Sequence, residues 1–422
     1  MFMVLGAAVA GGAVRRRWAY RARRIAAGVV VALVVIGGTT VAGAAAPPAQ
    51  TKTETIREQQ WHLDALRVPE AHRISTGKGV IVAVVDTGVQ ADHPDLAGQV
   101  LDGTRVADPG DRGKVDEDNH GTGVAGLIAA RGGGPNRALG IAPDAKILSV
   151  ATPIGAFGGT GVGEAIRWAV DHGASVINLS LSGRYAAPSV VEAVRYALQK
   201  DVVVVAAAGN LGTGDTTIGS PARIPGVLAV SAVDREGRFW SGGVRGPQMG
   251  IAAPGTDILT LSNSADDGRP GGYLKVPGGT SAAAPIVAGA AALVRARFPD
   301  LSAANVINRL LVTATDAGPE GRDEEYGFGR LDLLKALTAD VSPVSANPLG
   351  EPVDELDDAE EDDLRPLLTV AAVAGALMLV VVAFVVVLLL WLARRRGPGG
   401  RTPAHSVPGV GPPAPPSGRG GR

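Results

Sequence analysis

Short apolar runs alternate with amphipathic stretches between about residues 57 and 340. Continuous apolar runs of this length are typical of strands that are buried on both faces. Five of them are predicted strands: 79–89, 145–150, 174–181, 201–210 and 226–234. Residues 163–173 and 189–200 carry apolar positions at helical spacing, and the first stretch ends at a glycine. The alternation predicts an α/β fold, a parallel sheet with helices on both faces, whose active site lies at the carboxyl ends of the strands.

An apolar stretch near the N-terminus follows a cluster of arginines. "RARRIAAGVVVALVVIGG" is a basic region with a short apolar run, and small residues follow it. This layout predicts a secretory signal peptide over 1–46, with cleavage after Ala44 or Ala46. The alternative is an uncleaved membrane anchor, because a further apolar run, 2–14, precedes the basic region. Residues 47–59 are then a short N-terminal extension.

A second apolar stretch, 367–392, contains no charged residue. As a helix it would be roughly 39 Å long, enough to cross a hydrocarbon core of about 30 Å. A buried core helix is the alternative. Arg394, Arg395 and Arg396 follow at once, and arginines beside a span mark its cytoplasmic side. We therefore expect a single-pass cell-membrane protein with an extracellular domain, an acidic linker over 341–366, and a disordered basic Pro/Gly-rich cytoplasmic tail over 393–422.

Charge and cysteine content narrow the possible chemistry. The formal net charge of −1 offers no argument for a nucleic-acid partner. The chain contains no cysteine, so a thiol nucleophile, a disulfide and a cysteine metal site are excluded. The sequence predicts neither a metal site nor a cofactor.

Polar residues close two of the predicted strands. Asp86 ends the run "VAVVD", where a buried carboxylate is costly unless it is hydrogen-bonded or paired. Asn210 ends "VVVVAAAGN". Taken alone, each is equally compatible with a turn residue, since Asp and Asn accept unusual backbone angles. The functional alternatives are a partner for a base and an amide donor aimed into a cleft.

His120 and Ser281 each stand at the start of a small-residue helix. His120 opens "HGTGVAGLIAA", and Ser281 precedes three alanines and Pro285 in "GGTSAAAPIVAGAAAL". Proline is tolerated in the first turn of a helix, so we expect a helix to begin close to Ser281. The Ser281 hydroxyl is either a helix cap or a nucleophile, and His120 either an ordinary surface or core residue or a base.

Together these four residues match the parts of acyl-transfer chemistry. A histidine takes the serine proton, a buried aspartate holds the histidine tautomer, and amide donors stabilise the oxyanion. The chain order Asp, His, Ser is that of subtilisin, and no G-x-S-x-G elbow surrounds Ser281, which argues against an α/β-hydrolase.

Five motifs resemble those of the subtilisin-like serine proteases (subtilases): "VAVVDTGV", "HGTGVAG", "VINLSLSG", "VVVVAAAGN" and "GTSAAAPIVAG". The resemblance implies a subtilisin-like catalytic domain over 60–340, with Asp86, His120 and Ser281 as the triad. It also implies that Asn210 and the Ser281 N–H form the oxyanion hole. Two segments would bind an extended peptide substrate: Ser180, Leu181, Ser182 and Gly183, and Ala207, Ala208 and Gly209.

Within the subtilases, the layout resembles mycosins, the membrane-anchored proteases of type VII secretion. "VRARFPDLSAANVINRLLVTAT" is similar to the segment after the mycosin serine. Many mycosins carry cysteine pairs, and this chain has none. About a dozen residues separate the predicted cleavage site from "QQWHLDALRVPEAHRIS", which resembles the start of the catalytic domain, so a folded inhibitory propeptide does not fit between them.

The sequence therefore predicts a serine endopeptidase on the outer face of the cell membrane, associated with the type VII secretion membrane complex and acting on a polypeptide substrate. One alternative is a mainly structural component that stabilises such a complex. Another is a processing protease for an exported peptide.

Overall fold

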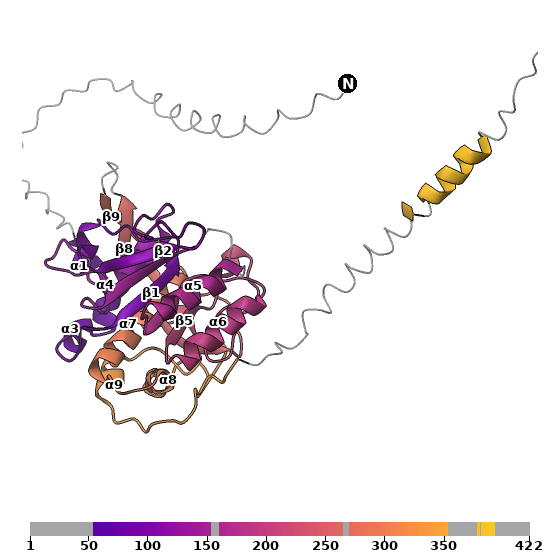
Figure 1. Ribbon diagram of the computed structural model, residues 1–422. Helices are drawn as coiled ribbons and strands as arrows, with labels where there is room; N and C mark the ends of the chain where they lie inside the picture. Colours follow the sequence, from indigo (N-terminus) through magenta and orange to yellow (C-terminus); the bar gives the residue numbers. More distant parts are fainter. Residues whose placement is uncertain (1–53, 153–159, 265–269, 353–377, 380, 393–422) are drawn as a thin grey trace, which may run out of the picture. The chain divides into compact units, whose positions relative to one another are not determined.

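The computed structural model describes residues 54–152, 160–264, 270–352, 378–379 and 381–392 (Figure 1). The predicted signal peptide, 1–46, and the predicted tail, 393–422, lie outside these residues. Part of the predicted span, 367–392, also lies outside them. Within the part of the chain that the structure describes, no helix is both long and apolar enough to cross a membrane.

Seven parallel strands form the central sheet, in the order β2-β3-β1-β4-β5-β6-β7. They are β1 (Ile81–Asp86), β2 (Val100–Arg105), β3 (Lys146–Ala151), β4 (Val176–Leu179), β5 (Val203–Ala207), β6 (Leu228–Val233) and β7 (Met249–Pro254). The five apolar runs that predicted strands correspond to β1, β3, β4, β5 and β6. The expected α/β architecture with a parallel sheet is confirmed.

Nine α-helices and two 3₁₀ turns accompany the strands in the described range 54–352. The helices are α1 (Ile56–Gln59), α2 (Trp61–Ala65), α3 (Val68–Ala71), α4 (His120–Ala129), α5 (Thr160–Asp171), α6 (Pro188–Gln199), α7 (Thr280–Arg297), α8 (Ala303–Val312) and α9 (Leu333–Thr338). The 3₁₀ turns are η1 (Pro94–Leu96) and η2 (Leu211–Thr213). Two of these helices, α5 and α6, correspond to the amphipathic stretches that the sequence pattern singled out.

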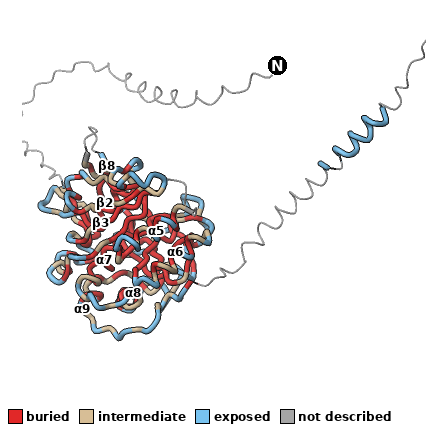
Figure 2. Tube along the Cα trace, in the orientation of Figure 1, coloured by how far each residue is buried: buried red, intermediate tan, exposed pale blue. Residues whose placement is uncertain are grey.

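Successive strand residues enter two separate cores, because side chains alternate across a sheet. Val82 and Val84 of β1 pack with α4 and α7, whereas Ala83 and Val85 pack with α5 and α6. Both faces of the sheet are therefore covered, which explains why most positions in its strands are apolar. Figure 2 shows the resulting buried interior of the domain.

This alternation also decides where the end of β1 points. Asp86 lies on the same face of β1 as Val82 and Val84, the face that α4 and α7 cover. In the sheet, β1 lies between β3 and β4, so the chain passes from one side of β1 to the other between these strands. In parallel sheets, ligands bind at such a topological switch point, beyond the carboxyl ends of the strands.

The hairpin of β8 (Thr256–Ser264) and β9 (Pro270–Gly278) packs against α4 outside the main sheet. The apolar pattern did not identify this hairpin, because polar residues interrupt its apolar runs, among them the buried Thr260 and Ser262. Small residues of α4 permit its close approach: the Thr260 hydroxyl donates to the Gly123 carbonyl over 2.6 Å. A methyl group at Gly126 would collide with the side chain of Leu261.

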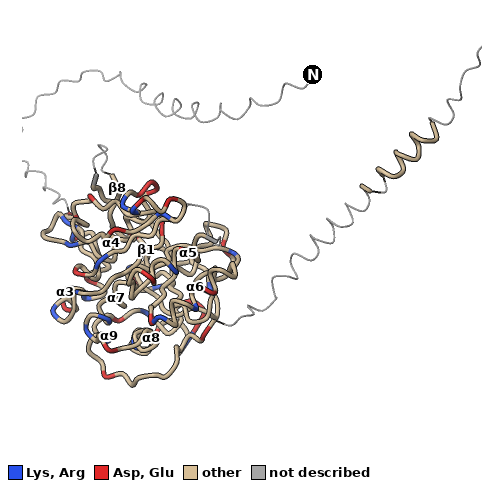
Figure 3. The backbone as a smooth tube through the Cα atoms, viewed as in Figure 1, with Lys and Arg blue, Asp and Glu red and all other residues tan. Residues whose placement is uncertain are grey.

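Segments on either side of the predicted catalytic domain pack against it. The Arg57 N–H donates to the Pro135 carbonyl over 2.9 Å, within the predicted N-terminal extension. Residues 341–352, which the sequence assigns to the acidic linker, are also attached: the Gly226 N–H donates to the Leu349 carbonyl over 3.0 Å. The folded unit therefore extends beyond 60–340 at both ends. Basic and acidic residues are interspersed along the domain, and the helical residues 381–392 carry none (Figure 3).

Candidate active site

Asp86, the last residue of β1, is hydrogen-bonded to His120, the first residue of α4. His120 Nδ1 donates to Asp86 Oδ1 over 2.8 Å, and the Thr87 N–H donates to the same oxygen over 2.8 Å. Because a carboxylate oxygen only accepts, the bond places the proton of a neutral imidazole on Nδ1. The His120 Nε2 lone pair is then available to take a proton.

The negative charge of Asp86 stabilises the protonated form of His120. It raises the pKa of His120 to about 9, against the opposing effect of burial, and Asp118 and Asp116 add to the increase. The Asp86 side chain is 3% exposed, so water hardly reaches the carboxylate, whereas the His120 side chain is 39% exposed. The pair can therefore accept a proton from a neighbouring hydroxyl and stabilise the imidazolium that results.

A buried carboxylate, Asp116, organises the loop that leads into His120. Asp116 is 3% exposed, and its two oxygens accept five hydrogen bonds of 2.6–3.1 Å. The donors are the Thr87 and Thr122 hydroxyls and the N–H groups of Asp118, Asn119 and Thr122. These bonds join the end of β1 to the first turn of α4. They hold the two elements that carry Asp86 and His120 in one fixed arrangement.

Ser281 is the second residue of α7, so the expected helix does begin close to it. The residue at the N-cap is Gly279, which has no side chain, and the Ser281 hydroxyl therefore does not cap the helix. The interpretation of Ser281 as a cap was wrong. Its hydroxyl remains available at the N-terminal end of α7, where the helix dipole is positive.

Pro285 lies in the second turn of α7 and cannot donate the usual helical hydrogen bond to the Ser281 carbonyl. The Ser180 hydroxyl supplies a donor instead, over 3.0 Å. Ser180 follows β4 and in turn accepts from Asn178 Nδ2 over 3.0 Å. The main chain at Ser281 is therefore tied to the carboxyl end of β4.

Asn210 follows β5 and is oriented by the residue before Ser281. Its side-chain oxygen accepts from the Thr280 N–H over 3.0 Å and from the Thr280 hydroxyl over 3.1 Å. A main-chain N–H can only donate, so the atom facing it is the amide oxygen. The Nδ2 donor lies at the other end of the amide, and Asn210 lines the cavity beside Ser281.

A cavity of about 560 Å³ lies on one side of His120 and Ser281. Its wall includes Asp86, Asn210 and five of the seven residues predicted to bind substrate: Ser180, Leu181, Ser182, Ala207 and Gly209. Gly183 and Ala208 do not line it. Gly183 is paired with Ser220 through two main-chain hydrogen bonds of 2.8 and 2.9 Å, and Ala208 is completely buried beside β6.

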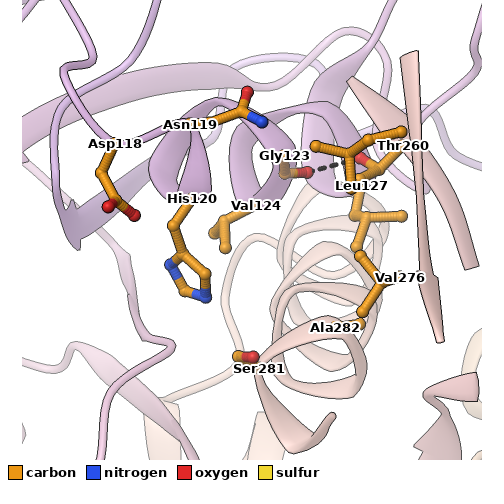
Figure 4. A pocket seen from close by; sticks show the side chains of 11 residues that line it. Asp118, Asn119, His120, Gly123, Val124, Leu127, Thr260, Val276, Ser281 and Ala282 are labelled. Atoms are coloured by element: carbon orange, nitrogen blue, oxygen red, sulfur yellow. Dashed lines mark hydrogen bonds between the residues drawn. The ribbon is translucent and has the colours of Figure 1, made fainter. Parts of the chain in front are cut away.

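A second cavity, of about 250 Å³, lies on the other side of the same two residues. Leu127 of α4, Val276 of β9 and Ala282 of α7 make its wall largely apolar. Figure 4 shows His120 extending from the start of α4 toward Ser281 at the start of α7. Within the described residues their side chains are not hydrogen-bonded to each other, and catalytic hydrogen bonds often tighten only when substrate binds.

Sequence reasoning missed residues that support or line the site. Asp116, Thr87 and Thr280 position the predicted residues, and Asp118 and Asp215 line the larger cavity. The acidic cluster "DEDNHGTG" was the available signal for Asp116 and Asp118. Across the described ranges, no group of three or more acidic or histidine side chains is arranged to hold a metal ion.

Comparisons with known proteins identify the family of this chain. The model of the subtilase family (Peptidase S8) matches residues 77–329, which include all four predicted catalytic residues. The chain is 34% identical to Mycosin-1 of Mycobacterium tuberculosis over 340 residues, covering 68% of this chain and 75% of that protein. It is 36% identical to fervidolysin of Fervidobacterium pennivorans over 311 residues, covering 67% of this chain but 44% of fervidolysin.

The solved structures that match include mycosins. The crystal structure of MycP1 from the ESX-1 type VII secretion system superimposes with a TM-score of 0.62 at 30% identity, covering 71% of this chain and 91% of that one. The structure of the MycP3 protease from the ESX-3 type VII system gives a TM-score of 0.58 at 36% identity, over 69% and 90%. The extent of the family match and these similarities show that the chain belongs to the subtilase family of serine peptidases.

Proposed function

We propose that Asp86, His120 and Ser281 form the catalytic triad of a serine endopeptidase, with Asn210 in its oxyanion hole. The observation that carries this assignment is the position of His120. Its Nδ1 is bound to Asp86 over 2.8 Å, and its ring faces the same two cavities as Ser281. The four residues come from four separate elements and meet at one edge of the sheet.

The reaction follows from these positions. The Ser281 hydroxyl oxygen attacks the carbonyl carbon of the scissile peptide bond, and His120 Nε2 takes the hydroxyl proton. Asn210 Nδ2 and the Ser281 N–H stabilise the oxyanion of the tetrahedral intermediate. His120 then donates its proton to the leaving amine nitrogen as the C–N bond breaks. Water, deprotonated by His120, hydrolyses the acyl-enzyme and restores Ser281.

Substitution of the nucleophile tests this assignment. We expect Ser281→Ala to lower kcat toward a fluorogenic peptide by about 10⁶-fold, the size of the loss known for subtilisin. Ser264→Ala, at the exposed end of β8, is the matched control and should retain activity. A sulfonyl fluoride should add its mass to one site in the unaltered chain and to none in Ser281→Ala. Full activity in Ser281→Ala would remove Ser281 as the nucleophile.

We further propose that the chain is anchored in the cell membrane by 367–392, with the catalytic domain outside and the tail from Arg394 inside. The uncharged length of this segment and the arginines that follow it support this topology. A protease added to cells stripped of their outer envelope should digest the catalytic domain and spare a tag at Arg422. Digestion of the tag with protection of the domain would overturn the proposed topology.

A structural role in a secretion complex is the second candidate function. One related solved structure is described as a serine protease that is an essential component of the type VII (ESX-1) secretion system. If this chain stabilises such a complex, a Ser281→Ala variant should still co-purify with the membrane components. Loss of the complex in that variant would instead tie its assembly to proteolysis.

A further inference from the structure

A third cavity, of about 240 Å³, lies away from the two that flank His120 and Ser281 and shares no lining residue with them. It is formed by α2, the turn after β6, the end of β7 and the segment that leads into α9. We call it the Arg330 pocket. The residues that matter to its chemistry are Trp61, Leu66, Arg67, Arg235, Arg330 and Leu331.

Arg330 is held firmly but its guanidinium has no protein acceptor in the described residues. Its main-chain N–H and carbonyl are both paired with Thr315 over 2.8 Å. Its Nη1 lies against Gly237, where an added methyl group would collide with it. Its Nε is completely buried and has no hydrogen-bond partner. Buried arginine donors are nearly always paired, because an unpaired one loses its hydration without compensation.

The acidic residues that line the pocket offset only part of the positive charge around it. Asp234 and Glu236 are paired with Arg238 over 2.9 and 3.0 Å, and Asp332 is paired with Lys335 over 3.3 Å. Neither Arg238 nor Lys335 lines the pocket.

Two further arginines, Arg67 and Arg235, do line the Arg330 pocket. In the part of the chain that the structure describes, neither of them forms an ion pair. The pocket is therefore lined by three arginines and three carboxylates, and once Arg238 and Lys335 are included, cations outnumber carboxylates by five to three.

The pocket also has an apolar wall. The Trp61 indole is fixed by a hydrogen bond from Nε1 to the Thr256 carbonyl over 3.1 Å, and the Arg235 guanidinium lies 5.5 Å from the ring centre. Leu66 and Leu331 extend this wall. A small inorganic anion would bind to the arginines without contacting the apolar wall. A carboxylate with an apolar side chain next to it would contact both the arginines and the apolar wall.

We propose that the Arg330 pocket binds a peptide carboxylate flanked by an apolar side chain. The carboxylate pairs with the guanidinium of Arg330, whose planar donors match it, and the side chain packs on Trp61. The proposal goes beyond peptidase activity and does not depend on it.

The Arg330 pocket is connected to the catalytic cleft through Trp61. Trp61 also packs with Leu127 and Ala282, which line the smaller cavity beside Ser281. A peptide segment in the Arg330 pocket therefore contacts a side chain that supports the wall of the cleft. The pocket is placed to hold a part of a polypeptide that lies outside the cleft.

Calorimetric titration of the full chain in detergent tests the proposal, in the Ser281→Ala background so that no peptide is cleaved. The probes are N-acetyl-leucine, which carries an α-carboxylate, and N-acetyl-glutamyl-leucinamide, which carries a side-chain carboxylate. The probe that binds more tightly shows which kind of carboxylate the pocket prefers. N-acetyl-leucinamide, which lacks the charge, should bind at least about tenfold more weakly than the better of these two probes. Inorganic phosphate should also bind more weakly than the better peptide probe, because it leaves the wall uncovered.

Arg330→Gln should weaken the better probe by at least about tenfold. Arg73→Gln, an exposed arginine at the end of α3 that does not line the pocket, should change it by less than about twofold. Circular dichroism checks the fold of Arg330→Gln. If that variant does not fold, Arg235→Gln, an exposed position, should weaken the same probe. Unchanged affinity in the folded arginine variant, equal binding of the uncharged amide, or phosphate binding as tight as the peptides would overturn the proposal.

Discussion

The Ser180 hydroxyl donates a 3.0 Å hydrogen bond to the main-chain carbonyl of Ser281. This bond replaces the helical one that Pro285 cannot make, and it joins the end of β4 to the first turn of α7. A residue first singled out for substrate binding therefore also holds the main chain of the proposed nucleophile. Ser180 lines the larger cavity as well, so the two roles have to be separated by experiment.

We expect Ser180→Ala to lower the free energy of unfolding by about 1–3 kcal/mol, because the Ser281 carbonyl loses its donor. Urea denaturation measures this change. Ser175→Ala is the control, since Ser175 precedes the same strand and donates a longer bond of 3.4 Å to the Ile81 carbonyl. Equal stability of the unaltered chain and Ser180→Ala would show that the bond contributes nothing.

Two substitutions of Asn210 separate its donor from its acceptor. Asn210→Asp retains an oxygen that accepts from Thr280 but has no Nδ2 donor, whereas Asn210→Ala loses both. We expect both variants to lower kcat by about 10²–10³-fold, the range known for loss of an oxyanion donor in subtilisin. Asn210→Ala alone should lose stability as well. A raised KM with unchanged kcat would show that Asn210 binds substrate or shapes the turn.

The pH dependence of activity should reflect the Asp86–His120 pair. The base must be unprotonated, and Asp86 raises the pKa of His120 to about 9, so kcat/KM should increase as pH rises toward that value. The same pair stabilises the fold most below the ordinary histidine pKa of about 6.5 and loses this contribution as pH rises through about 9.

Asp118→Asn should move the midpoint of this activity profile to lower pH, because the negative charge of Asp118 favours the imidazolium. The shift should shrink at high salt, since Asp118 is exposed. Asp144→Asn is the control, because Asp144 lines neither cavity beside His120. An unchanged midpoint in Asp118→Asn would show that its charge does not reach His120.

Acid should destabilise the domain through His62, which is completely buried in α2 with neither ring nitrogen hydrogen-bonded. Burial, with a smaller effect from Arg57, lowers the pKa of His62 to about 3. Stability is then fully present above about pH 6.5 and is lost as pH falls toward 3, by an amount on the order of 4 kcal/mol.

His62→Leu should remove part of this acid sensitivity. Its Tm should exceed that of the unaltered chain at pH 5, and the advantage should shrink at pH 8, where both forms of the residue are neutral. Thermal melts across this pH range measure the difference. The same acid sensitivity in both proteins would show that His62 is not its source.

The larger cavity should favour a cationic substrate side chain. Asp118 and Asp215 line it, and among the described residues no lysine or arginine does. In matched peptides that differ only before the scissile bond, we expect lysine to exceed glutamate in kcat/KM by about tenfold or more. Asp215→Asn should reduce this preference, with a leucine peptide as the uncharged reference. Preference for glutamate would contradict the charge argument.

The sequence by itself determined the class of fold and the residues at its centre. Strands buried on both faces are apolar at most positions, so β1, β3, β4, β5 and β6 were visible as nearly continuous apolar runs. Polar residues stand out at the ends of such runs, which is why Asp86 and Asn210 could be singled out. In β8 and β9, polar residues and glycines interrupt the apolar runs, so these strands carry no comparable signal.

Only the tertiary structure decided which residues support or surround these centres. Asp116 acts through hydrogen bonds to β1 and α4, and Ser180 through one to α7, across 101 positions of the chain. Gly183 and Ala208 do not line the cleft as predicted, because their main chains are hydrogen-bonded to other residues. Trp61, Arg235 and Arg330 share a pocket although they are far apart in sequence. Hydrogen bonds and cavities join residues by their distance in space, and the order of residues along a chain does not record that distance.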